Sequence, residues 1–171
     1  RAESFRANRA WGDAPAPDLK GFLREARVDV DDIEFSSPSI HGFSFWGTAC
    51  GATVRINKSS PRYGFRWTLQ MLLAHELCHL LYDATPDHGV SILSSAEETD
   101  GPTEARANAF AIELLLPRSS LLNALQGGKP DGDTARKLME HFCIGATALA
   151  WHLQNLGVLD RIADRHDIAI E

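Results

Sequence analysis

The stretch that decides the fold runs from Thr68 to Tyr82 and reads TLQMLLAHELCHLLY. It contains no glycine or proline and is rich in leucine, which predicts one uninterrupted helix. Because almost every other residue in it is apolar, we expect this helix to be buried on most sides. His75 and His79 lie four residues apart, so their side chains project roughly 40° apart around the helix axis, one turn along it. Two imidazoles placed in this way can bind a single metal ion.

Glu76 follows the first histidine, which completes an HExxH pattern. Its side chain points to one side of the histidine pair, where it can reach a water at the metal without being a ligand itself. A carboxylate and two imidazoles are costly to bury unless they are paired, and a metal ion with its water would compensate all three. This pattern is typical of metallopeptidases in which the glutamate is the general base. The alternative is a solvent-facing helix that carries these residues without chemistry.

A third ligand should come from a neighbouring element, and we expect it to be Glu104. A second helix is predicted from Pro102 to Leu116, ending before Pro117. Asn108, one turn beyond Glu104, can accept a hydrogen bond from a ligand imidazole and fix its tautomer. Arg106 and Glu113 project from the opposite face, which predicts that they face solvent.

Other assignments stay open at this point. Glu104 could instead be favoured simply by its place at a helix N-terminus. Cys78 lies within a turn of both histidines, although a small packing residue is the better interpretation. The rival ligands lie in the predicted connection 83–101: His88, Glu97, Glu98 and Asp100. That long connection could also act as a gate. The candidates for stabilising a negatively charged intermediate are Arg66, Tyr82, His88, His141 and His152.

The remaining pattern predicts an α+β fold. Asp18 can cap a helix that runs to about Arg27. Residues 42–46 and 52–57 read as a hairpin, so we expect a small antiparallel sheet packed on the HExxH helix. The strand 52–57 could offer an unpaired edge to an extended substrate, or it could equally be an ordinary strand within the sheet. Further helices are predicted at 119–126, 133–142 and 146–156.

Composition limits the function classes. The chain has 171 residues, with 17 Lys and Arg against 23 Asp and Glu, so its formal charge is -6. This balance argues against a broadly basic nucleic-acid binder, and no apolar run approaches the length of a membrane span. Three cysteines without a CxxC pair argue against a disulfide scaffold, so we expect a cytoplasmic protein.

We expect four segments along the chain. Residues 1–17 form a linker or N-terminal extension, 18–118 the domain that carries the HExxH helix, 119–160 a helical subdomain, and 161–171 a charged tail. The sequence opens at Arg1 and not at a methionine, which leaves room for a preceding domain in a longer protein.

Two motifs together resemble the ImmA/IrrE family of metallopeptidases. The first is HELCHLL at 75–81, and the second is EARANAFAIELLLP at 104–117. The family's second motif reads E-x-x-A-N-x-F-A-x-x-L-L-x-P, and this chain has every fixed position of it. The strand Val54–Asn57 and the helices after Pro117 also fit the family's layout. The resemblance covers roughly residues 40–160.

The resemblance implies a zincin-like domain followed by a helix-turn-helix-like helical subdomain. It implies His75, His79 and Glu104 as metal ligands and Glu76 as the catalytic base, with Zn²⁺ as the expected metal and Mn²⁺ as the alternative. The implied substrate is a helix-turn-helix (Xre-type) repressor of a mobile element or of a stress or defence system, encoded beside the peptidase or fused to it.

Two other function classes compete with a peptidase. One is a sensor or regulatory module whose metal is only structural. The other is a DNA-binding regulator, with residues 135–156 as a helix-turn-helix. Residues 146–156 contain no lysine or arginine, so we do not expect this chain to bind DNA directly.

Overall fold

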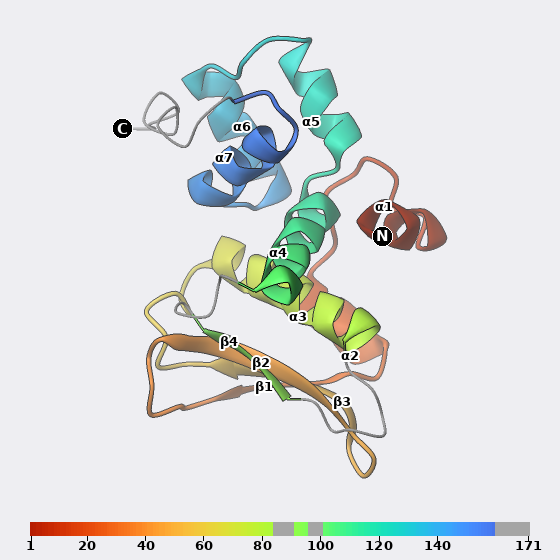
Figure 1. The fold of residues 1–171 in the computed structure, drawn as a ribbon, viewed down its shortest axis with the longest axis vertical. Coiled ribbons are helices and arrows are strands. Elements are labelled where there is room, and N and C mark those ends of the chain that lie inside the picture. Colours follow the sequence, from red (N-terminus) through yellow and green to blue (C-terminus); the bar gives the residue numbers. More distant parts are fainter. Residues whose placement is uncertain (84–90, 96–100, 160–171) are drawn as a thin grey trace. The chain divides into compact units, whose positions relative to one another are not determined.

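The structure, a computed structural model, describes residues 1–83, 91–95 and 101–159. Within these residues the chain forms seven helices and one four-stranded sheet (Figure 1). It divides into two compact units, Pro17–Ala111 and a second made of Arg1–Ala16 with the residues from Ile112 onward. The predicted α+β class is confirmed, whereas the four predicted segments stay a prediction.

The sheet of the first unit is mixed, so the prediction of a purely antiparallel sheet was wrong. Its order is β1-β3-β2-β4. The predicted hairpin is present as β2 (Ile40–Gly47) and β3 (Gly51–Asn57), which pair antiparallel. β1 (Asp29–Ile33) instead pairs parallel with β3. β4 (Ser91–Ser95) pairs antiparallel with β2 and lies within the segment 83–101, which we predicted only as a long connection.

Asn57 explains why β1 lies beside β3. Its buried side chain accepts hydrogen bonds from the backbone N–H groups of Phe35 and Ser59 and donates to the carbonyls of Ser37 and Ile40. These bonds fix the connection between β1 and β2 across the end of β3. The chain therefore reverses direction after β1 and enters the sheet on the far side of β3. Sequence periodicity does not report such a side-chain bridge.

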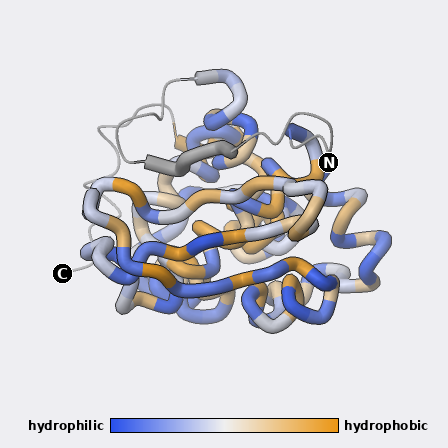
Figure 2. The backbone as a smooth tube through the Cα atoms, turned by 90° about the horizontal axis from the view of Figure 1, so that it is seen from below, coloured by the Kyte–Doolittle hydropathy of each residue, from blue (hydrophilic) through white to orange (hydrophobic). Residues whose placement is uncertain are grey.

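Helix α3 (Arg66–Tyr82) packs on this sheet, as predicted from its composition. Gly42 of β2 permits the close approach, because a Cβ there would lie 2.8 Å from the carbonyl oxygen of Arg55 and 3.0 Å from Leu72. Helix α2 (Leu19–Glu25) lies beside α3 and is capped by Asp18, as predicted. Gln70 of α3 bonds the backbone at Leu19 and Pro17, which ties the two helices together. Hydrophobic and hydrophilic segments alternate along the strands (Figure 2), as expected for a sheet covered on one face.

Helix α4 (Pro102–Leu115) begins in the first unit and continues into the second. The second unit also contains α1 (Ala2–Asn8), α5 (Arg118–Leu125), α6 (Gly132–Phe142) and α7 (Ala146–Asn155). Arg6 of α1 is buried and donates hydrogen bonds to the carbonyls of Leu114 and Gly12. The predicted helices at 119–126, 133–142 and 146–156 are present, and each end lies within one residue of its predicted position.

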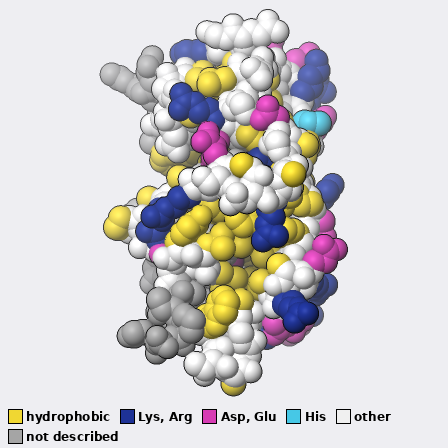
Figure 3. Space-filling view, turned by 90° about the vertical axis from the view of Figure 1, so that its right-hand side faces the viewer, with side chains coloured by type: hydrophobic (Ala, Val, Ile, Leu, Met, Phe, Trp, Pro, Cys, Tyr) yellow, Lys and Arg dark blue, Asp and Glu magenta, His cyan; other side chains and the backbone are white. Residues whose placement is uncertain are grey.

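The surface drawn in Figure 3 carries basic and acidic side chains in a mixture, without a broad patch of either sign. Among the described residues, no helix is both long enough and apolar enough to cross a bilayer.

Candidate metal centre

His75, Glu76 and His79 all lie in the buried part of α3. Glu76 is fully buried, and His75 and His79 are 7% and 1% exposed. The helix is held on the sheet at this level, because the hydroxyl of Ser44 in β2 donates to the carbonyl of Glu76 at 3.4 Å. The packing that the leucine-rich sequence imposes therefore places these three polar side chains inside the protein.

Glu104 comes from the first turn of α4 and faces the histidine pair. One carboxylate oxygen lies 3.0 Å from Nε2 of His75, and the other lies 3.3 Å from Nε2 of His79. The two Nε2 atoms are 2.9 Å apart. One ligand atom from each of the three residues fits within 4.8 Å of the others, so this group could hold a metal ion. The structure thus brings together the three residues that the sequence predicted as ligands.

The hydrogen bonds of the two Nδ1 atoms determine the tautomers of His75 and His79. Nδ1 of His75 donates to Oδ1 of Asn108 at 2.9 Å, and Nδ1 of His79 donates to Oδ2 of Asp83 at 2.9 Å. A carboxylate oxygen or an amide oxygen can only accept, so each Nδ1 carries a hydrogen. In the neutral rings, both Nε2 atoms then present a lone pair to the same point as the Glu104 carboxylate.

This donor set fits a divalent cation. Two imidazole lone pairs and a carboxylate that converge on one point repel one another unless a positive charge lies between them. Glu104 and His75 also shift each other's pKa values. Burial lowers the pKa of His75, but hydrogen bonding to Glu104, with the charges of Glu76 and Glu104, outweighs it and raises the pKa overall. Burial likewise raises the pKa of Glu104, but hydrogen bonding to His75 and the charges of His75 and His79 outweigh it and lower the pKa overall, which favours the ionised carboxylate.

Asn108 accepts from His75, which is the position predicted for it. The prediction that Arg106 and Glu113 simply face solvent was wrong. Arg106 forms an ion pair with Asp83 across α3 and α4. Glu113 accepts from the backbone N–H of Arg118 and lies 3.5 Å from His152. A helical wheel shows the direction of a side chain but not the neighbouring element that it meets.

The other candidates are not part of the group of three potential ligands found among the described residues. Cys78 is buried, and none of the three cysteines, all within the described chain, forms a disulfide. His141 and His152 belong to the second unit, and Tyr82 ends α3 with its ring edge-on to Phe110. The rivals that lie outside the described residues are His88, Glu97, Glu98 and Asp100.

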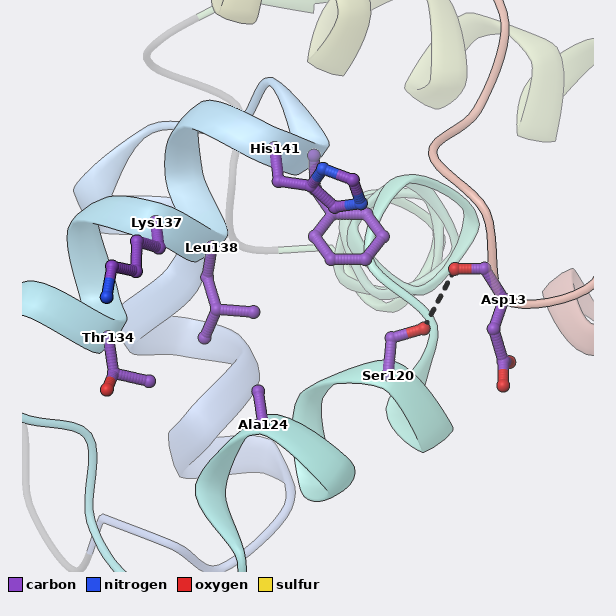
Figure 4. A pocket seen from close by; sticks show the side chains of 8 residues that line it. Asp13, Ser120, Ala124, Thr134, Lys137, Leu138 and His141 are labelled. Atoms are coloured by element: carbon purple, nitrogen blue, oxygen red, sulfur yellow. Dashed lines mark hydrogen bonds between the residues drawn. The ribbon is translucent and has the colours of Figure 1, made fainter.

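The second unit has an open pocket of about 450 Å³ between α5, α6 and the segment at Asp13 (Figure 4). Leu138, Ala124 and Phe142 contribute apolar side chains, and Ser120 donates to the backbone carbonyl of Asp13 at 3.1 Å. None of the three potential ligands lines this pocket.

Two histidines on one helix and a carboxylate from a second helix are a donor set found in metallopeptidases, in which a glutamate next to the first histidine is not a ligand. The comparison with protein families agrees. The model of the Peptidase_M78 family (IrrE N-terminal-like domain) matches residues 24–153, and the chain belongs to this family. A search of curated proteins gave no match.

Proposed function

We propose that this chain is a zinc-dependent endopeptidase that hydrolyses a peptide bond in a protein substrate. The observation that supports this most strongly is the convergence of His75, His79 and Glu104 from two helices, with ligand atoms within 4.8 Å. The fully buried Glu76 lies next to His75 in the chain, and its charge acts on that imidazole. We propose Zn²⁺ as the metal, with Mn²⁺ as the alternative.

The residues have separate tasks in this proposal. His75, His79 and Glu104 hold the ion, and Asn108 keeps Nε2 of His75 directed toward it. When bound, the ion supplies Lewis acidity, which acidifies water and polarises the peptide carbonyl. Glu76 takes the proton from water as its oxygen attacks the carbonyl carbon, and then passes that proton to the leaving amine.

The sheet topology supports one mode of substrate binding. The prediction that β3 offers an open edge was wrong, because β3 lies between β1 and β2. β4 is an edge strand of the described sheet, and it pairs with β2 at Ser44, whose hydroxyl contacts the backbone of Glu76. We therefore propose that an extended substrate adds to β4 through its main chain. A substrate peptide N-methylated at alternate amides should be cleaved poorly if this is correct.

We propose that the substrate is a helix-turn-helix (Xre-type) repressor of a mobile element or of a stress or defence system. It would be encoded beside this chain or fused to it. The support is membership in the family, together with the resemblance of the motifs at 75–81 and 104–117. A cytoplasmic location is part of this proposal, since the substrate is a transcription factor and the three cysteines form no disulfide.

The decisive experiment incubates the zinc-loaded chain, or its Glu76→Gln variant, with the adjacent or fused repressor. Glu76→Gln keeps the size of the side chain and removes the base, so it should bind zinc normally and not cleave. Equal cleavage by both proteins would contradict the proposal. Zinc binding without any dependence of function on Glu76 would favour a metal-stabilised sensor. Salt-dependent binding of the isolated chain to DNA would favour the regulator, although α7 carries no lysine or arginine.

A further inference from the structure

Asp83 is the C-cap residue that follows the last residue of α3, and it makes two contacts with its carboxylate. Oδ2 accepts from Nδ1 of His79 at 2.9 Å, and Oδ1 accepts from the guanidinium of Arg106. The side chain of Asp83 is 14% exposed, and that of His79 is 1% exposed. The carboxylate is therefore largely withdrawn from water and bonded through both oxygens.

The two histidines of the centre are held in equivalent ways. His75 has Asn108 at its Nδ1, and His79 has Asp83 at the same position. Each acceptor leaves Nε2 of its ring directed at Glu104. The neutral amide and the charged carboxylate differ, because a carboxylate makes the stronger hydrogen bond and increases the basicity of the imidazole.

Arg106 connects this arrangement to the second helix. It lies in α4 between Glu104 and Asn108, and it pairs with Asp83. One helix therefore carries the third ligand, the acceptor that orients His75, and the anchor of the acceptor that orients His79. Since α3 and α4 are distant in sequence, the pair Asp83–Arg106 also fixes the end of α3 against the first turns of α4.

We infer that Asp83, anchored by Arg106, is a positioning residue that orients His79 for metal binding. This inference rests on the proposed function, because it assigns the pair a task toward the ion held by His75, His79 and Glu104. Asp83 touches neither the ion nor the substrate in this scheme, and it acts through the ring of His79.

The test measures Zn²⁺ affinity by competition with a chromophoric chelator, without any assay of cleavage. Asp83→Ala should weaken Zn²⁺ binding by about 10- to 100-fold, because the ring of His79 loses its fixed tautomer and orientation. Asp83→Asn should restore part of the affinity, since an amide oxygen can still accept from Nδ1. Arg106→Met should weaken binding less, by about 3- to 10-fold. In the Asp83→Ala background, Arg106→Met should add no further loss, because Arg106 acts through Asp83.

The chain offers a matched control pair in the same unit. Asp29 of β1 and Arg55 of β3 form an ion pair at 2.6 Å, and the guanidinium of Arg55 also donates to the backbone carbonyls of Asp29 and Val54. Asp29→Ala and Arg55→Met should leave the Zn²⁺ affinity unchanged. The backbone N–H of Asp83 bonds the carbonyl of His79 at 2.9 Å and is kept in every variant, so α3 should still end at the same residue. Circular dichroism and thermal unfolding of the metal-free variants check this.

Two results would overturn the inference. One is an Asp83→Ala variant that binds Zn²⁺ within about twofold of the wild type. The other is an Arg106→Met variant whose loss of affinity is the same with and without Asp83. In both cases the proposed function survives, provided that the wild type binds Zn²⁺ and Glu104→Gln does not. A wild-type chain that fails to bind Zn²⁺ would overturn the proposed function and the inference together.

Discussion

The Nε2 atoms of His75 and His79 lie 2.9 Å apart, and both face the carboxylate of Glu104. The histidine pair follows from one turn of α3, which the spacing of the motif already dictates. The position of Glu104 depends on how α4 packs on α3. The contacts of Glu104 with both imidazoles therefore depend on the spacing of the histidines within α3 and on the packing of α4 against α3.

Glu104→Gln should reduce Zn²⁺ affinity by at least about 100-fold, because an amide is a much weaker ligand than a carboxylate for this ion. Equilibrium competition with a chelator measures this loss directly. Glu25→Gln removes an exposed carboxylate at the end of α2 and should have no effect. Retention of wild-type affinity by Glu104→Gln would mean that the third ligand is another residue.

Asn108→Ala should remove the acceptor that fixes His75 in one tautomer, and it should weaken Zn²⁺ binding by about 10- to 100-fold. In the zinc-free wild type, two-bond ¹H–¹⁵N spectra recorded at a pH above the raised pKa of His75 should show the neutral ring with its hydrogen on Nδ1. The variant should show both tautomers, and Asn108→Asp should keep the Nδ1–H form. If His75 keeps that form in Asn108→Ala, another group fixes the ring.

Gly42→Ala should destabilise the fold by about 1–3 kcal/mol, because the added methyl group enters a space that the backbone of Arg55 and the side chain of Leu72 already fill. Denaturant unfolding measures the difference. Gly64→Ala is the matched control, since a Cβ at Gly64 meets no atom within 4 Å. A neutral effect of Gly42→Ala would show that α3 is not tightly held against β2.

His152 should make stability depend on pH. Burial lowers its pKa to about 4, partly offset by a backbone hydrogen bond with Leu116, and Arg118 lowers it further. Burial raises the pKa of the facing Glu113, which therefore gives the imidazolium less support as the pH falls. As the pH falls, the imidazole of His152 is therefore protonated at a higher pH in the unfolded state than in the folded state. The contribution of the neutral imidazole to the free energy of unfolding is complete above pH 6.5 and is lost as the pH falls toward 4.

The loss in the free energy of unfolding is up to roughly 3 kcal/mol, calculated from the difference between the two pKa values of His152. Urea unfolding between these pH values should show the loss in the wild type and a much smaller loss in His152→Gln. His141→Gln changes an exposed histidine and should keep the wild-type slope. Parallel curves for the wild type and His152→Gln would contradict the assignment.

The parts of the fold that sequence could predict are those with a local cause. Helix α3 follows from an uninterrupted leucine-rich run, α2 begins at the cap Asp18, and the hairpin of β2 and β3 follows from two short strands around a turn. The parallel pairing of β1 could not be predicted, because it depends on Asn57 bonding a connection that is distant in sequence. β4 lies in a serine-rich segment without a strand pattern and is paired only through β2.

The candidate site likewise has residues that sequence could predict from local spacing and residues that depend on tertiary contacts. His75, Glu76 and His79 are fixed by spacing within one helix, and the motif that starts at Glu104 identified the second helix. Asp83 was missed, although it follows His79 by four residues and so lies one turn along the same face. Its pairing with Arg106 depends on the contact between α3 and α4 and could not be read from either segment alone.

The most direct test of the central claim is a crystal structure of the zinc-loaded chain with anomalous diffraction data collected at the zinc edge. The account predicts one strong anomalous peak at about 2.0–2.2 Å from Nε2 of His75, Nε2 of His79 and a carboxylate oxygen of Glu104. A peak bound by other residues, or zinc-saturated crystals with no peak between α3 and α4, would contradict it.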